Sequence, residues 1–215
     1  MTERARPADA EALDRVIRAR RSARRFSSEA VSRDAVADVV EAGRQAPYAG
    51  LSNRGTTDFR RFFAIARGSA VHALLRERIR AVVGAKADAF AAAQADPDPR
   101  AAGMLAAMRG IAEKGPPPWD AAWLLVVAER RGFPPREGQA LAHALENMWL
   151  EATALGLGLQ LVSAVEDLSD DDAACAALGL RTGEFLLGAC LLGPSADLPR
   201  ESARTEPELR LTWFA

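Results

Sequence analysis

The segment Ala121-Ala122-Trp123-Leu124-Leu125-Val126-Val127-Ala128 decides the fold. It is an uninterrupted apolar run of strand length, which is typical of a central strand covered on both faces. Shorter apolar runs at 62–66, 159–163 and 185–192 predict three further strands. Segments with apolar residues at intervals of three and four separate these strands. The sequence therefore predicts an α+β fold, in which helices pack on a sheet.

The spacing of the apolar residues predicts helices at 9–20, 32–43, 71–83 and 138–155. Ser32 begins the second of these and can cap its free amide groups. Ser169, with Asp172 three residues later, resembles a capping box that opens a further helix ending at Gly179.

The chain of 215 residues contains no repeat or linker that divides it, so we expect a single domain over residues 1–215. The stretch 84–118 is rich in alanine and has prolines near both ends, which predicts a helical excursion that acts as a lid over a site. The final stretch, 194–215, is polar but ends in aromatic residues. We expect it to be a C-terminal extension that folds onto another surface.

The charge is balanced, with 28 Lys and Arg against 29 Asp and Glu and a net charge of -1, which excludes general nucleic-acid binding. No apolar run approaches the roughly 20 residues of a membrane helix, and the N-terminus lacks the apolar region of a secretory signal, so a cytoplasmic location is expected. Cys175 and Cys190 are expected to be buried free thiols. His72 and His143 form no metal-ligand pattern, so no metal site is expected.

The run Arg20-Arg21-Ser22-Ala23-Arg24-Arg25-Phe26 gathers four guanidinium groups and one hydroxyl group behind a helix. A guanidinium group binds phosphate through a planar fork of donors and keeps its charge. The run is therefore a candidate phosphate site. Because arginine-rich runs are often solvated surface, the run alone leaves both interpretations open.

Four blocks of sequence follow the order found in one family. They are the basic run 20–26, Ala46-Pro47 followed by Asn53-Arg54, the helical segment 146–152 with its exit Gly156-Leu157-Gly158, and Leu178-Gly179-Leu180 followed by Leu191-Leu192-Gly193-Pro194. Each block is weak alone, but together they span nearly the whole chain. On these residues the chain resembles the FMN-dependent nitroreductase family.

The resemblance implies a nitroreductase-like fold, with a central, mostly antiparallel sheet in three α-β-α layers. It also implies an intertwined homodimer that binds FMN in two sites at the subunit interface. Arg20 and Ser22 would hold the FMN phosphate and ribityl end, with Arg21 beside them. Arg204 would be a further phosphate ligand, and Arg24 would lie near the pyrimidine edge of the flavin.

The resemblance also places the segment from Leu161 to Ala164 beside the flavin, with the backbone amides of Ser163 and Ala164 available to N5 and O4. Two departures from the family pattern matter: the lid region 84–118 carries no recognisable substrate code, and the loop after Ala46-Pro47 is altered. Tyr48 replaces the serine that usually follows Ala-Pro, and the Gln-Pro-Trp signature is absent after Asn53. Asn53 is still a candidate for the polar edge of the flavin. Tyr48 is a candidate proton donor to a reduced substrate, and the plainer alternative is that it packs against the helix.

The family resemblance implies an FMN oxidoreductase driven by NADH or NADPH. Hydride would reach flavin N5, the first product would leave, and a nitroaromatic, quinone or similar electrophile would be reduced in the same slot, in a ping-pong scheme. This scheme needs no protein nucleophile or general base, and none can be assembled from two histidines and scattered acids. Two alternatives stay open. One is a specialised flavin enzyme, such as a dedicated metabolite dehydrogenase or a flavin-consuming enzyme, and the other is a non-catalytic flavin or small-ligand binding protein.

Overall fold

The computed structural model describes residues 7–93, 99–196 and 210–214. Within these residues a four-stranded sheet has the order β1-β2-β4-β3, and every pair of neighbouring strands is antiparallel. The strands are β1 (Arg60–Ala66), β2 (Trp123–Arg130), β3 (Gly158–Leu161) and β4 (Phe185–Gly193). The helices are α1 (Ala8–Ala19), α2 (Arg33–Arg44), α3 (Ala70–Ala93), α4 (Pro99–Lys114), α5 (Glu137–Ala154) and α6 (Asp172–Ala177), with a 3-10 helix η1 (Ser163–Leu168).

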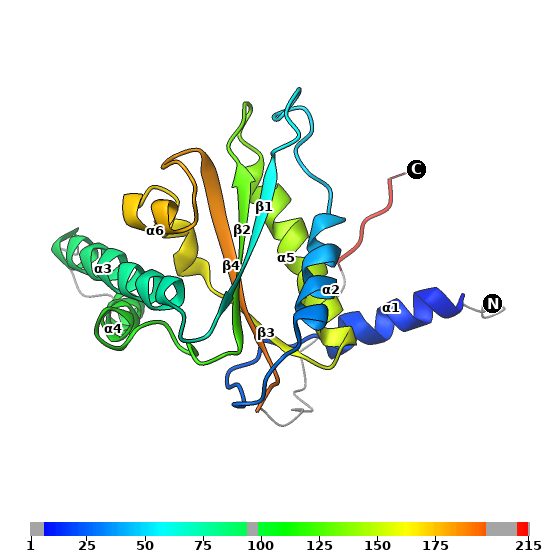
Figure 1. Cartoon of the computed structure of the whole chain (residues 1–215), viewed down its shortest axis with the longest axis horizontal. Coiled ribbons are helices and arrows are strands. Elements are labelled where there is room, and N and C mark those ends of the chain that lie inside the picture. The colour runs from blue at the N-terminus through cyan, green and yellow to red at the C-terminus, as the bar shows by residue number, and fades with distance from the viewer. Residues whose placement is uncertain (1–6, 94–98, 197–209, 215) are drawn as a thin grey trace.

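The elements form three layers, with α2 and α5 on one face of the sheet and α3, α4 and α6 on the other (Figure 1). The central strand β2 supplies both cores. Leu124 and Val126 belong to the core under α3, whereas Leu125 and Val127 belong to the core under α2 and α5. A strand turns successive side chains to opposite faces of the sheet. All four side chains are buried, because helices cover both faces. The expected α+β fold, with an antiparallel sheet between helices, is confirmed.

Two local predictions need correction. The helix α6 is capped by Asp171 and not by Ser169: the carboxylate of Asp171 accepts a hydrogen bond of 2.9 Å from the amide of Ala174. The Ser169 hydroxyl instead donates to the carbonyl oxygen of Glu166 and accepts from the amide of Leu187. In addition, α3 does not end near Val83 but continues to Ala93.

The C-terminal stretch is described only at residues 210–214. There Trp213 and Phe214 are 84% and 94% exposed. The expected contact of this stretch with another surface is therefore not made by these two side chains within the single chain.

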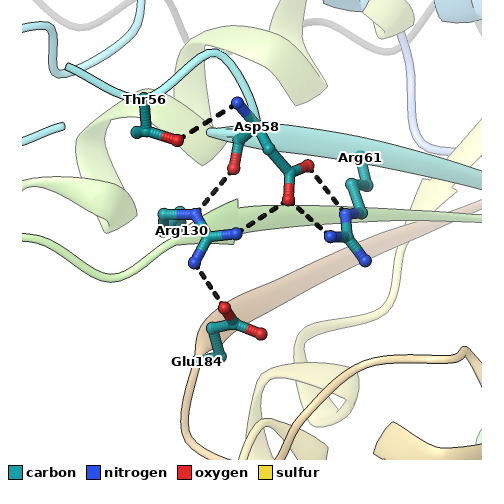
Figure 2. A network of polar contacts seen from close by, with 5 residues as sticks. All are labelled: Thr56, Asp58, Arg61, Arg130 and Glu184. Carbon is teal, nitrogen blue, oxygen red and sulfur yellow. Dashed lines mark hydrogen bonds and ion pairs between the residues drawn. The ribbon is translucent and has the colours of Figure 1, made fainter.

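An ion-pair network ties the ends of three strands together (Figure 2). Asp58 accepts hydrogen bonds from Arg61 and from Arg130, and Arg130 also donates to Glu184. Both guanidinium groups lie over the ring of Phe185, at 5.0 and 4.6 Å from its centroid. The hydrogen bond from Arg61, followed by that from Arg130, lowers the pKa of Asp58 to about 2.

We expect Asp58→Asn to lower the free energy of unfolding at pH 7 by about 1 kcal/mol, a small value because the carboxylate is 43% exposed and solvent screens it. The pKa of Asp58 is lower in the folded protein than its ordinary value of 3.8, so its stabilisation is complete above that value and is lost as the pH falls toward about 2. Urea unfolding of both proteins at pH 7 and pH 2.5 measures the difference. A difference that stays the same at both pH values would contradict this assignment.

Candidate functional site at the edge of the sheet

The basic run lies along the free edge of β3. Ser22 forms a parallel bridge with Leu159, and the amide of Ala23 donates a hydrogen bond of 3.0 Å to the carbonyl oxygen of Leu159. Phe26 is buried and forms an antiparallel bridge with Ser195, which follows β4. The run is therefore fixed to the sheet by its backbone.

Arg20 projects toward α5. Its guanidinium carbon lies 4.4 Å from the centroid of the Trp149 ring, and its Nε is 3.2 Å from a carboxylate oxygen of Glu146. The indole N–H of Trp149 donates to the carbonyl oxygen of Arg21, which holds the run against the helix. The side chain of Arg21 itself turns back to the end of α1, where it donates to the carbonyl oxygens of Arg18 and Arg20.

Arg24 projects to the other side of the run, into a hollow of about 280 Å³ that is also lined by Arg25 and by residues of α3 and α4. Four steps of extended chain separate Arg20 from Arg24, a span of roughly 13 Å. The run thus carries two separated positive charges along one edge, with Ser22 between them.

Beside the run, the chain leaves β3 and enters η1. The backbone amides of Ser163 and Ala164 stand at the start of η1, where a helix offers amide donors without partners inside the helix. Over the described parts of the chain, neither amide makes a hydrogen bond. Leu161, just before them, is 40% exposed. We call the group Arg20, Ser22, Arg24, Leu161, Ser163 and Ala164 the edge site.

Tyr48 and Asn53 do not belong to the edge site of the same chain. They lie in the loop before β1, at the end of the sheet where Arg60 pairs with Glu129, whereas Ser22 lies at the end where Trp123 pairs with Leu192. Six steps along β2, from Trp123 to Glu129, separate these ends, which is about 20 Å at roughly 3.3 Å per residue. One chain therefore does not bring all the predicted residues together, and Arg204 lies outside the described residues.

The loop before β1 lines a second hollow, which has a volume of about 460 Å³. Tyr48 is half exposed there and stacks on Phe59, with ring centroids 3.9 Å apart. Asn53 is 6% exposed, and its side-chain nitrogen has no hydrogen-bond partner in the described structure. From α5 and the segment before it, Arg136, Gln139 and His143 complete the lining. The sequence reasoning assigned these three residues no role in a site.

A buried ion pair sets the shape of this second hollow. Arg60 and Glu129 are 2.6 Å apart, and their side chains are 2% and 0% exposed. Arg60 also donates hydrogen bonds of 3.0, 3.0 and 3.1 Å to the carbonyl oxygens of Gly43, Ala46 and Pro47, so it holds the end of α2 and the turn that carries Tyr48. Burial raises the pKa of Glu129, and the hydrogen bond from Arg60 opposes that shift. The pair joins residues 69 positions apart, and no local pattern indicates it.

Among the described residues, no group of His, Cys, Asp and Glu side chains is arranged to hold a metal ion. Cys175 and Cys190 are buried free thiols, as expected.

None of the described helices combines the length and the apolar character needed to cross a membrane.

Comparison with known proteins identifies the class. The model of the nitroreductase family matches residues 17–194, so the chain belongs to the nitroreductase family. No curated protein sequence matches the chain.

Solved structures show the same fold. A nitroreductase with bound FMN from Bacteroides fragilis is 22% identical, with a TM-score of 0.67 over 94% of this chain and 98% of that one. A BluB-like flavoprotein from Clostridium difficile is 24% identical, with a TM-score of 0.61 over 86% and 91%. A nitroreductase with bound FMN from Desulfitobacterium hafniense is 18% identical, with a TM-score of 0.56 over 94% and 98%.

We expect Arg60→Met to lower the free energy of unfolding by about 3–5 kcal/mol, because it leaves the carboxylate of Glu129 buried without its partner. Adding Glu129→Gln should recover part of the loss, since a neutral amide costs less to bury than a charge. Arg61→Met is the matched control: the neighbouring ion pair is about 40% exposed and should contribute at most about 1 kcal/mol. Urea unfolding measures all three, and equal losses at positions 60 and 61 would contradict the role of the buried pair.

Proposed function

We propose that this protein is an FMN-dependent oxidoreductase that uses NADH or NADPH to reduce nitroaromatic, quinone or similar electrophilic compounds. The observation that carries the proposal is the edge site, in which the run with Arg20, Ser22 and Arg24 is paired to β3 beside two amide donors that have no partner among the described residues. Membership of the nitroreductase family supports the same reading, as do the solved structures of this fold with bound FMN.

The residues of the edge site fit FMN in charge and in order. A phosphate needs cationic and hydroxyl donors, which Arg20 and Ser22 supply at one end of the run. The flavin ring needs donors toward N5 and O4, which the amides of Ser163 and Ala164 can supply. Arg24, at the other end of the run, adds a permanent positive charge that favours a negatively charged ring.

Within the single chain, Arg20 contacts Trp149 and Glu146. The carboxylate of Glu146 lies against Nε of Arg20, one of the donors that a phosphate could use. A phosphate carries more negative charge than a carboxylate, so it can replace Glu146 as the partner of Arg20. Trp149 then still fixes the plane of the guanidinium group.

FMN, when bound, supplies the redox chemistry by accepting hydride from a nicotinamide and passing it to an oxidising substrate. The chain has to bind the cofactor, orient its ring and exclude water. Arg20 and Ser22 bind the phosphate, and the amides of Ser163 and Ala164 set the position of the ring. Leu161 presents an exposed apolar side chain where the ring would lie.

We also propose that the working unit is a homodimer, because the site is incomplete in one chain. Tyr48 and Asn53 lie at the opposite end of the sheet from Ser22, and about 20 Å of β2 separates the two ends, so only a second copy can bring them to the edge site. The exposed surface agrees: α1 has no buried residue and projects from the body, with Leu13 and Ile17 53% and 43% exposed (Figure 1). A second copy would cover these apolar side chains.

The purified protein should be yellow, or become yellow when FMN is added. Its absorbance near 450 nm should bleach under anaerobic conditions with NADH or NADPH and return when a quinone or nitroaromatic compound is added. Flavin that binds but is reduced by neither nucleotide would favour a specialised flavin enzyme or a flavin-binding protein. A protein that takes up no FMN would contradict the proposal.

We expect Arg20→Ala to weaken FMN binding about 10- to 100-fold, because it removes a charge-assisted hydrogen bond. Ser22→Ala should weaken binding about fivefold, and Glu146→Gln should strengthen it a few-fold by removing the competing carboxylate. Arg33→Ala, an exposed arginine at the start of α2, is the matched control and should leave binding unchanged. Fluorescence titration with FMN measures each constant. Unchanged affinity in both Arg20→Ala and Ser22→Ala would show that the phosphate end is assigned wrongly.

A further inference from the structure

The hollow next to Arg24 gathers more positive charge than the edge site needs. Arg24 and Arg25 of the run line it together with Arg76 of α3 and Lys114 of α4. These four side chains come from three separate parts of the chain. One acidic residue, Asp120, also lines the hollow. We call this group, with the segment 115–119 that forms its remaining wall, the basic hollow.

The fold holds Arg76 in place. Arg76 donates a hydrogen bond of 2.5 Å to the carbonyl oxygen of Lys114, and Arg80 donates one of 3.0 Å to that of Ala112, so α3 clamps the end of α4. Gly115 follows with a φ of +87°, and a Cβ built on it would lie 2.6 Å from Nε of Arg76. Only glycine allows this close approach, and the guanidinium group is consequently positioned before any ligand arrives.

Like charges repel, so the guanidinium group of Arg76 and the ammonium group of Lys114, which line one small hollow, attract a counter-charge. The volume of about 280 Å³ suits a small molecule. Pro116–Pro118 and Trp119 form the apolar part of the wall, which suits the body of a planar molecule. A planar compound that carries an oxyanion matches both the basic side chains and the apolar wall of the hollow.

The basic hollow adjoins Arg24, the residue that the proposed function places next to the flavin ring. We propose that it binds the carboxylate or phosphate of a redox substrate, so that the enzyme prefers anionic substrates to neutral ones with the same reacting group. This inference rests on the proposed function for its reaction, but the binding of an oxyanion to the hollow does not. The oxyanion can belong to the electron acceptor or to the 2′-phosphate of NADPH, and the test separates these two sources.

The first measurement concerns the acceptor. The FMN-loaded protein is reduced by light and EDTA without any nicotinamide and is mixed anaerobically with 4-nitrobenzoate or with 4-nitrobenzamide. The rate of flavin reoxidation is divided by the rate with free reduced FMN, which removes the difference in intrinsic reactivity. We expect a preference for 4-nitrobenzoate of about tenfold at low ionic strength, falling in 0.5 M salt because salt screens exposed charges.

Lys114→Gln should reduce this preference about fivefold and leave 4-nitrobenzamide unaffected. The substitution preserves the bond from Arg76, which uses the backbone carbonyl of Lys114. Arg109→Gln is the matched control, since Arg109 is exposed on the same helix but does not line the hollow. The same variants are compared for flavin reduction by NADPH and by NADH. A fall in the NADPH preference with Lys114→Gln, without a change for the acceptors, assigns the oxyanion to the nucleotide.

Calorimetry gives a readout that does not depend on turnover. We expect 4-nitrobenzoate, but not 4-nitrobenzamide, to bind the flavin-free protein, and Lys114→Gln to weaken this binding about fivefold. If the protein takes up no added FMN but binds 4-nitrobenzoate in this way, the proposed function alone is contradicted. The inference about the hollow alone is overturned by a protein whose flavin is reduced and reoxidised normally but without any preference for the anionic acceptor. In that case Lys114→Gln would also change neither the acceptor and nucleotide preferences nor the calorimetric binding of 4-nitrobenzoate.

Discussion

The hydrogen bond from the amide of Ala23 to the carbonyl oxygen of Leu159 is the contact on which the candidate site depends. It aligns the basic run with β3 and so determines that Arg20 reaches α5 while Arg24 reaches the basic hollow. Gly158 makes this contact feasible, since a Cβ built there would lie 2.8 Å from the Cβ of Ala23. The glycine at the exit of α5 thus has a physical role in bringing the run to the edge.

The edge site and the loop that carries Tyr48 lie at opposite ends of the sheet, and different contacts hold each of them in place. At one end, backbone pairing with β3 and the indole of Trp149 hold the run. At the other end, Arg60 and Glu129 hold the turn that carries Tyr48. A buried ion pair is costly to form, and it is useful here because one guanidinium group satisfies three carbonyl oxygens at the end of a helix. A second chain is the means by which the two parts would meet.

Much of the fold could be predicted from the sequence, because its signals are local. The apolar run around Leu125 defined the central strand, although the strand begins two residues later, at Trp123, and continues to Arg130. Ser32 caps α2 as its position indicates. Ser169 misled the prediction because its hydroxyl bonds to Glu166 and Leu187 instead, and the helix begins only at Asp172, where Asp171 caps it. The basic run was visible in the sequence as a candidate site. The Arg60–Glu129 pair, and the position of Arg76 and Lys114 next to the basic run, depend on long-range packing that no sequence spacing reveals.

The central claim is that the basic run and β3 together hold the cofactor. Hydrogen exchange tests this claim most directly, because it locates the segments that FMN contacts. Amide exchange followed by mass spectrometry, with and without FMN, reports protection for each segment of the chain. The account predicts that FMN slows exchange in segments 20–26 and 158–165, including the amides of Ser163 and Ala164. Protection confined to other segments, or no protection in these two when FMN is bound, would contradict it.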